Sequence, residues 1–239
     1  MPDCKIVLVA IFLGVAICDP RNSGYSTTTS SSNYIENWNG TFIVPSNATA
    51  VKDKVEIKVY YETLCQFSVD FFVQQLEPAL KRLPSHLDIH LIPYGHAETI
   101  RANGGYKFNC QHGVPECFGN TLQACAIDVL KNTTKVLPFN TCLMRNISYR
   151  TSYSHVMSVI NWCGAEHDVH VQDIWRCVHS RRGSYLLKRY GDETHAVAPA
   201  FVPYLTIDGT TLYQEQALNN LVATVCQMLT PKPRECLTD

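Results

Sequence analysis

The sequence has few charged residues and no cluster of one sign. Asp, Glu, Lys and Arg together make up only 17% of its 239 residues, and the formal net charge is −1. No run of five basic residues occurs, so the sequence lacks the electrostatic footprint of a nucleic-acid-binding protein. We therefore expect no nucleic acid as a partner.

Several common catalytic motifs are absent as well. The sequence contains no G-x-S-x-G, no P-loop and no H-E-x-x-H. These absences leave no support for a serine hydrolase of that type, a nucleotide-hydrolysing enzyme or a zinc protease. We expect no cofactor and no metal ion.

Long apolar runs are also lacking. The apolar stretch from Ile6 to Ile17 has 12 residues, and a membrane-spanning helix needs about 20. Lys5 precedes this stretch, and the small residues Ala16 and Cys18 end it, which is the pattern of a signal peptide over residues 1–18. The alternative is an uncleaved anchor. No later stretch is apolar enough to be transmembrane, so we expect a secreted or endosomal/lysosomal protein.

The sequence does contain four N-x-[ST] acceptor sites for N-glycosylation, which agree with export. They predict a glycoprotein in which these asparagines lie on the surface: Asn39, Asn47, Asn132 and Asn146.

Nine cysteines remain after removal of residues 1–18, since two of the 11 lie in that segment. In an oxidising compartment most should pair, and an odd number leaves at least one free. The simplest partition leaves Cys65 free, which would also allow a disulfide-linked dimer. The other eight would form structural disulfides whose pairing the sequence does not determine: Cys110, Cys117, Cys125, Cys142, Cys163, Cys177, Cys226 and Cys236.

The pattern of apolar residues predicts a polar Ser/Thr-rich leader over 19–53 and an α/β domain over 54–239. Strands are expected at 55–61 and 87–93, joined by a helix that Pro78 should kink or end near Glu77. This βαβ unit requires parallel strands. A disulfide-rich helical insertion should follow at about 98–190, with helices near 117–132, 136–149, 153–163 and 168–181.

After the insertion, the sequence predicts a third strand at 202–207, a turn at Asp208-Gly209, a short fourth strand from Thr210 to Tyr213 and a helix from Ala217 to Leu229. This order of elements is that of a thioredoxin-like fold with a helical insertion between the second and third strands.

Cys65 stands where the first strand turns into the first helix. Unpaired N–H groups and the positive end of the helix dipole favour a thiolate there, and a thiolate attacks disulfides. A two-thiol redox site would have its second cysteine at position 68, but the residue is Ser68. A hydroxyl does not resolve a mixed disulfide. The alternative for Cys65 is a structural disulfide.

Pro203 opens the third predicted strand, which is unusual for a central strand. A cis-proline at this place in a thioredoxin-like fold faces the reactive cysteine. The alternative is a trans proline at the start of a strand.

Residues 110–125 carry the dense pattern C-Q-H-G-x-x-E-C-x-x-N-x-x-x-x-C. Here the chain resembles the gamma-interferon-inducible lysosomal thiol reductases (GILT family), and the resemblance covers about residues 55–236. It implies a thioredoxin-like, glycosylated protein that reduces protein disulfides in acidic endosomes and lysosomes. It also implies a nucleophile at Cys65 and a substrate-side cis-proline at Pro203.

The chain departs from the usual C-x-x-C site of that family, because Gln66 stands in place of proline and Ser68 in place of the resolving cysteine. We expect at most monothiol disulfide exchange through Cys65, with impaired reductase activity. The alternative is a non-catalytic, disulfide-stapled extracellular scaffold that binds proteins.

One alternative for the segment 110–125 is a metal site, and a further expectation concerns its histidine and His96. Cys110, Cys117 and Cys125 with His112 would suit zinc, although their spacing is not that of a zinc knuckle. His112 and His96 are expected to be packing or surface residues rather than acid–base catalysts.

Overall fold

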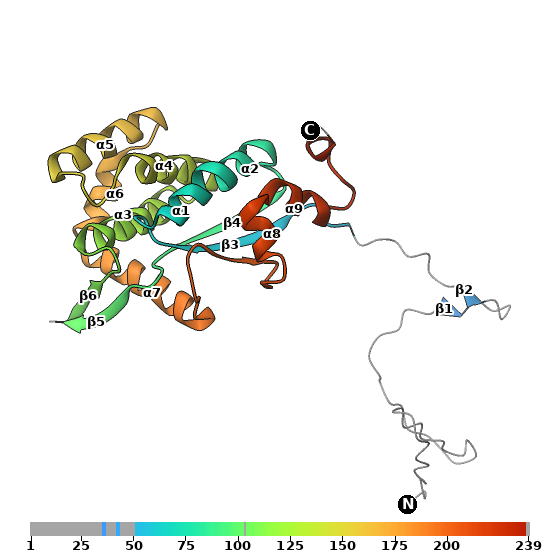
Figure 1. Cartoon of the computed structure of the whole chain (residues 1–239), viewed down its shortest axis with the longest axis horizontal. Helices are drawn as coiled ribbons and strands as arrows, with labels where there is room; N and C mark the ends of the chain where they lie inside the picture. The colour runs from blue at the N-terminus through green and yellow to red at the C-terminus, as the bar shows by residue number, and fades with distance from the viewer. Residues whose placement is uncertain (1–34, 37–41, 44–50, 103, 238–239) are drawn as a thin grey trace, which may run out of the picture. The chain divides into compact units, whose positions relative to one another are not determined.

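The structure of this chain is a computed structural model, and it describes residues 35–36, 42–43, 51–102 and 104–237 (Figure 1). The chain divides into two units, Met1–Ala48 and Thr49–Asp239. In the first unit, β1 (Ile35–Glu36) and β2 (Phe42–Ile43) form a short antiparallel pair that the sequence did not predict. The expected signal peptide lies outside the described residues, as does most of the leader.

The second unit is built on a three-stranded sheet in the order β4-β3-β7. The central strand β3 (Val55–Tyr61) runs parallel to β4 (Leu87–Pro93) and antiparallel to β7 (Tyr204–Ile207). In β3 the apolar residues alternate with Glu56 and Lys58, so Val55, Ile57 and Val59 all face the core. The predicted strands at 55–61 and 87–93 are confirmed.

The crossover between β3 and β4 is helical throughout, but its geometry changes along its length. α1 (Gln66–Phe71) passes into a π-helical segment, η1 (Phe72–Leu76), which leads into α2 (Glu77–Arg82). Pro78 is the second residue of α2, and the Glu77 N–H bonds to the Phe72 carbonyl five residues back. The interruption predicted at Pro78 thus takes the form of a π-turn, after which the chain stays helical to Arg82.

The first part of the expected helical insertion is not helical. β5 (Glu98–Ala102) and β6 (Gly105–Asn109) form an antiparallel hairpin. The sequence between them contains Asn103-Gly104, a residue pair that hairpin turns favour, and Gly104 has a φ of +74°. This turn chemistry outweighs the helical pattern inferred for the segment.

Five helices follow the hairpin and lie together beside the sheet (Figure 1). The predicted helices correspond to the first four, displaced by a few residues at their ends. The fifth was not predicted, because the predicted helix 168–181 runs across a break at which the Ser180 side chain caps a new helix by accepting the Arg182 N–H. They are α3 (Val114–Leu130), α4 (Thr133–Asn146), α5 (Tyr153–Glu166), α6 (Val171–Val178) and α7 (Arg181–Val197).

The fourth strand predicted from Thr210 to Tyr213 is wrong. The turn at Asp208-Gly209 forms, with Ile207 and Thr210 exchanging both backbone hydrogen bonds, but no strand continues from it. The Gln214 side chain instead accepts the Leu205 N–H at 2.7 Å, a donor that a fourth strand would have needed.

The C-terminal helix is divided. The predicted helix from Ala217 to Leu229 consists of α8 (Gln214–Asn219) and α9 (Leu221–Met228), and Asn220 between them caps α9 by accepting the Ala223 N–H at 3.1 Å. A short 3₁₀ turn, η2 (Arg234–Cys236), follows. Across the described ranges, no helix combines the length and apolar character that a membrane span requires.

Four disulfides staple this fold and leave Cys65 as the free cysteine of the described residues. Three lie within the segment 110–177, and the fourth ties the C-terminal turn back to α9. The pairs are Cys110–Cys117, Cys125–Cys177, Cys142–Cys163 and Cys226–Cys236.

Candidate active site around Cys65

Cys65 occupies the N-cap position of α1, directly after the loop that leaves β3. Its carbonyl accepts the Val69 N–H at 3.0 Å, so the backbone already belongs to the helix. Its side chain makes no capping bond, and the residue is 8% exposed. The thiol therefore lies just below the surface, at the positive end of a helical segment.

The loop before β7 faces this thiol. The Cys65 sulfur lies 3.8 Å from the carbonyl oxygen of Val202, which accepts its weak hydrogen bond. The Val202–Pro203 peptide bond is cis. Two segments that are 137 residues apart in the sequence thus meet at the sulfur.

Ser68 lies one turn into the helix and is completely buried. Its Oγ accepts the backbone N–H of Glu62 at 3.4 Å, which links the start of the helix to the end of the strand. A side chain in this position points into the protein rather than toward a substrate. Ser68 occupies the sequence position of the resolving cysteine in a two-cysteine site. Its hydrogen bond with the Glu62 N–H gives it a structural role there.

A cavity of about 390 Å³ lies between the helical crossover and the Val202–Pro203 loop. Cys65 does not line it, but Val202, whose carbonyl oxygen contacts the Cys65 sulfur, does. Phe67 on one side is 74% exposed, and Phe201 on the other is also exposed. Aromatic side chains at a surface offer large apolar contact areas to a binding partner. The lining residues are Phe67, Asp70, Phe71, Gln74, Gln75, Phe201, Val202, Pro203 and Leu218.

The segment 110–125 braces the other side of the Cys65 loop. Asn120, which is buried in α3, accepts both the N–H of Thr63 at 3.0 Å and its hydroxyl at 2.9 Å. Gly119 allows this approach, because a Cβ there would lie 2.5 Å from the Thr63 Oγ1. The sequence pattern thus fixes the backbone two residues before the thiol.

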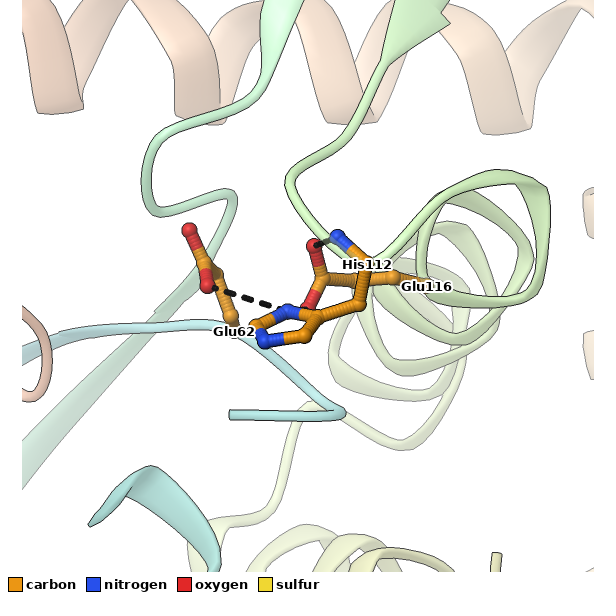
Figure 2. Close-up of side chains that lie close together, drawn as sticks. All are labelled: Glu62, His112 and Glu116. Carbon is orange, nitrogen blue, oxygen red and sulfur yellow. Dashed lines mark hydrogen bonds and ion pairs between the residues drawn. The ribbon is translucent and has the colours of Figure 1, made fainter. Parts of the chain in front are cut away.

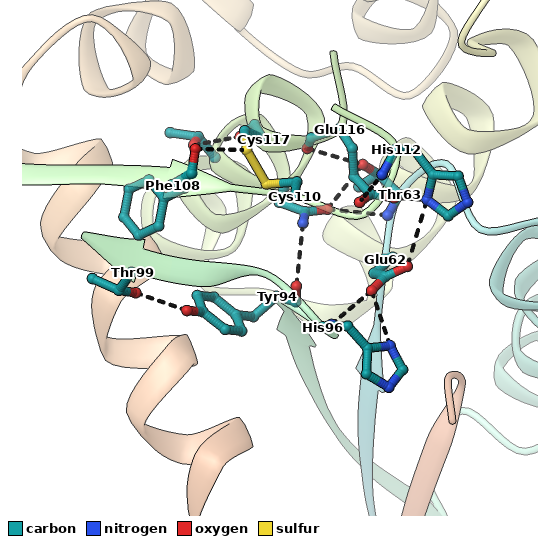
Figure 3. Close-up of a disulfide and its surroundings, with 12 residues drawn as sticks. Glu62, Thr63, Tyr94, His96, Thr99, Phe108, Cys110, His112, Glu116 and Cys117 are labelled. Atoms are coloured by element: carbon teal, nitrogen blue, oxygen red, sulfur yellow. Dashed lines mark hydrogen bonds and ion pairs between the residues drawn. A yellow bond between two sulfur atoms is a disulfide. The ribbon is translucent and has the colours of Figure 1, made fainter. Parts of the chain in front are cut away.

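Figure 3 shows a cluster of two carboxylates and two imidazoles beside the Cys110–Cys117 disulfide. Glu62 accepts the backbone N–H of His96 at 2.6 Å and faces its ring Nδ1 at 3.2 Å. Glu116 accepts the backbone N–H of His112 at 3.1 Å and its Nδ1 at 2.6 Å. Both carboxylates are fully buried.

Burial raises the pKa of Glu62 above its usual range, and the Glu116 carboxylate raises it further; the His96 N–H opposes both effects. The zinc set of three cysteines with His112 is wrong, because Cys110, Cys117 and Cys125 are all in disulfides. His96 and His112 are partly exposed, in line with the expectation of packing or surface residues, and each also contacts a buried carboxylate.

Sequence reasoning missed Glu62, and nothing in its neighbourhood singles it out. His112 and Glu116 are four residues apart at the start of a helix, which is a spacing that brings side chains together. The exposed aromatic residues Phe67 and Phe201 flank Cys65 and Pro203 in the sequence, and that proximity was an available indication.

Two of the four predicted glycosylation sites lie in the described residues. Asn132 is exposed at the start of α4. Asn146 at the end of α4 is half-buried, and its Nδ2 donates to the Cys142 carbonyl at 2.9 Å. Asn39 and Asn47 lie outside the described residues.

Comparison with known proteins finds both sequence and structural relatives. The family profile "Gamma interferon inducible lysosomal thiol reductase (GILT)" matches residues 56–167. A gamma-interferon-inducible lysosomal thiol reductase-like protein of Anopheles gambiae is 31% identical over 200 residues, which cover 78% of this chain and 81% of that protein. A gamma-interferon-inducible lysosomal thiol reductase of Carassius auratus is 32% identical over 189 residues, or 76% of this chain and 72% of that one.

Solved structures show the same fold at much lower identity. The reduced form of the disulfide bond oxidoreductase DsbG from Mycobacterium tuberculosis superposes with a TM-score of 0.52 at 14% identity, covering 76% of this chain and 81% of that one. A putative protein disulfide isomerase from Nitrosomonas europaea gives 0.51 at 11% identity, covering 73% and 98%. The predicted α/β, thioredoxin-like fold is confirmed.

Proposed function

The chain belongs to the gamma-interferon-inducible lysosomal thiol reductase family, and on that premise we propose that it exchanges disulfides through a single thiol, Cys65. The observation that carries the proposal is the placement of this sulfur. It is the free cysteine of the described residues, it lies at the N-cap of a helix, and its sulfur is 3.8 Å from the carbonyl oxygen of Val202, a residue that lines the cavity.

In the proposed first step, the Cys65 thiolate attacks one sulfur of a substrate disulfide. A new S–S bond forms between Cys65 and that sulfur, the substrate S–S bond breaks, and the other substrate sulfur leaves as a thiolate that takes a proton from solvent. Cys65 presents this sulfur from the N-cap position of α1.

The second step needs a thiol from outside the site. Ser68 is buried, accepts the Glu62 N–H, and carries an oxygen that does not displace sulfur to make a disulfide. A small external thiol must therefore attack the substrate sulfur of the mixed disulfide, so that Cys65 is the leaving group. This attack returns the Cys65 thiolate and leaves the external thiol joined to the substrate. A second equivalent of thiol completes the reduction, so turnover should be slow.

The cavity lined by Val202 and Pro203 suits an extended protein segment as substrate. Phe67 and Phe201 stand on opposite sides of it with their rings exposed. Apolar residues near the substrate disulfide would bury these rings on binding, which gives affinity without a deep pocket.

We place this activity in the secretory pathway, with the protein either secreted or delivered to endosomes and lysosomes. The basis is the predicted signal peptide at 1–18, the leader at 19–53 and glycosylation at Asn39, Asn47, Asn132 and Asn146. In this scheme residues 54–239 form the thioredoxin-like domain, with the insertion at about 98–190.

The test is a mixed-disulfide trap. The purified chain is incubated with a protein carrying an accessible disulfide, and covalent adducts are identified by mass spectrometry with and without a small thiol. The wild type should form an adduct at Cys65 that the small thiol releases, and Cys65→Ser should form none. Ser68→Cys should speed release without added thiol, whereas the matched variant Ser68→Ala should not. Absence of any adduct at Cys65 would contradict the proposal.

A second function, protein binding without chemistry, is favoured by the low exposure of the thiol. Cys65 is only 8% exposed, while the adjacent Phe67 is 74% exposed. Under this alternative, Cys65→Ser binds unfolded protein as well as the wild type, Phe67→Ala binds less, and the wild type forms no adduct. The same samples therefore distinguish an exchange enzyme from a scaffold.

A further inference from the structure

Three side chains from the end of β3 and the start of α3 converge in a way that disulfide exchange does not use. We propose that Glu62, His112 and Glu116 form a binding site for a divalent first-row metal ion, for which Zn²⁺ is the test ion. One donor atom from each side chain lies within 4.8 Å of the other two (Figure 2).

The two carboxylates are held in matching positions. Oε1 of Glu62 accepts the His96 N–H at 2.6 Å, and Oε1 of Glu116 accepts the His112 N–H at 3.1 Å. Each carboxylate is thus fixed by one oxygen, and its Oε2 points toward Nδ1 of His112, at 3.6 Å for Glu62 and 2.6 Å for Glu116. The three donors therefore come from three fixed backbone positions, as a preformed metal site requires.

The Glu62 Oε2 atom is the second indication. It is buried and makes no hydrogen bond within the described part of the chain. Unpaired buried polar atoms are costly, so natural proteins rarely keep them without a reason. A cation between Glu62 and Glu116 would satisfy this oxygen and neutralise two carboxylates that are completely buried.

The donor set indicates the class of ion. One imidazole nitrogen and two carboxylate oxygens suit zinc and its neighbours, and three protein ligands leave a fourth position for water. The His112 side chain is 34% exposed, which leaves an opening toward solvent. Ca²⁺ takes six to eight oxygen ligands and should bind much more weakly. On binding, the proton between His112 Nδ1 and Glu116 Oε2 would pass to solvent.

The experiment measures metal binding directly and does not depend on disulfide exchange. The full chain with its disulfides intact is prepared in a Cys65→Ser background, because the free thiol would itself bind zinc. It is stripped with EDTA, dialysed and titrated with Zn²⁺ by calorimetry. We expect one saturable site per chain. Glu62→Gln and His112→Asn should each weaken it by about 100-fold or more, and His96→Ala, which removes only an orienting contact, by about 10-fold.

A matched control addresses binding by surface histidines. His90 and Asp88 form an exposed pair with 3.4 Å between their charged atoms, so His90→Asn should leave the affinity unchanged. Binding that Glu62→Gln leaves intact, or that His90→Asn weakens equally, would mean an adventitious ion only. Absence of saturable binding, or Ca²⁺ binding as tight as Zn²⁺, would also overturn the proposal. If Glu62→Gln fails to fold by circular dichroism, His112→Asn, altered at a partly exposed side chain, decides the question.

Discussion

The junction between β3 and α1 carries one free thiol, whereas the segment from Cys110 to Cys177 carries three disulfides. The first region is held by the β4-β3-β7 ladder and an apolar core. The second consists mainly of helices around a separate core that includes five half-cystines. Covalent bonds are therefore concentrated where no sheet orders the chain, and the thiol lies where packing and hydrogen bonds suffice to hold it.

Removing a long-range disulfide from the helical region should have the largest effect. Cys125–Cys177 closes a separation of 52 residues, whereas Cys226–Cys236 closes only 10. Loop-closure entropy then predicts a loss of about 4 kcal/mol for Cys125→Ala with Cys177→Ala, and about 3 kcal/mol for Cys226→Ala with Cys236→Ala. Urea unfolding of the two double variants measures the difference. The reverse order would show that the helical region does not depend on its covalent bonds in this way.

The turn after β4 tests how tightly the region around the thiol is packed. Gly95 has a φ of +59°, and a Cβ there would lie 2.1 Å from the Glu62 Cγ. Left-handed strain together with this overlap predicts that Gly95→Ala costs about 3 kcal/mol. Gly209 has a φ of +74° with open space around it, so Gly209→Ala should cost only about 1 kcal/mol. Equal losses of unfolding free energy in the two variants would mean that the overlap is relieved by movement of Glu62.

The buried amide of Asn120 helps to join the helical region to the thiol loop. Asn120→Ala would leave the buried Thr63 N–H without its partner, which predicts a loss of about 2 kcal/mol. Asn161 on α5 is exposed, and Asn161→Ala should change stability by less than about 0.5 kcal/mol. Adduct formation by Cys65 should also slow in the Asn120 variant. A stable Asn120 variant with normal adduct formation would argue that the two regions are independent.

The smallest effect is expected from pH. The folded-state pKa of Glu62 is raised, chiefly by burial, above the ordinary value of about 4.5. As pH rises from about 4.5, the unfolded chain releases this proton before the folded chain does, so the contribution of Glu62 to stability falls. Glu62→Gln should therefore reduce the decline in unfolding free energy between acidic and neutral pH, measured in EDTA. An unchanged decline would assign it to other groups.

The sequence predicted those parts of the fold in which local pattern and tertiary structure agree. Alternating residues in 55–61 and 87–93 gave both parallel strands with the observed bounds. The prediction of a strand at 210–213 was wrong because the Gln214 side chain accepts the Leu205 N–H that such a strand would have used. The periodicity of the sequence does not reveal this contact. The helical character predicted for 98–109 was wrong, because the turn pair Asn103-Gly104 favours the hairpin that forms there.

The candidate site also has parts that the sequence predicts and parts that only the folded structure shows. Cys65, Ser68 and Pro203 were chosen from their places along the chain, and the structure brings the Cys65 sulfur to the Val202–Pro203 loop. The disulfide pairs could not be chosen, because pairing depends on how the helices pack. The approach of Glu62 to His112 joins two loops that are distant in sequence, and only the folded chain shows it.

The outer edge of β7 has one more consequence. Its two outward donors are already used, since the Leu205 N–H bonds to the Gln214 side chain and the Ile207 N–H to the Thr210 carbonyl. Exposed strand edges have unpaired backbone groups with which another chain can pair, which leads to aggregation. A protein proposed to handle unfolded polypeptides meets many such chains, and this edge offers them no free donor, so it gives little opening for aggregation.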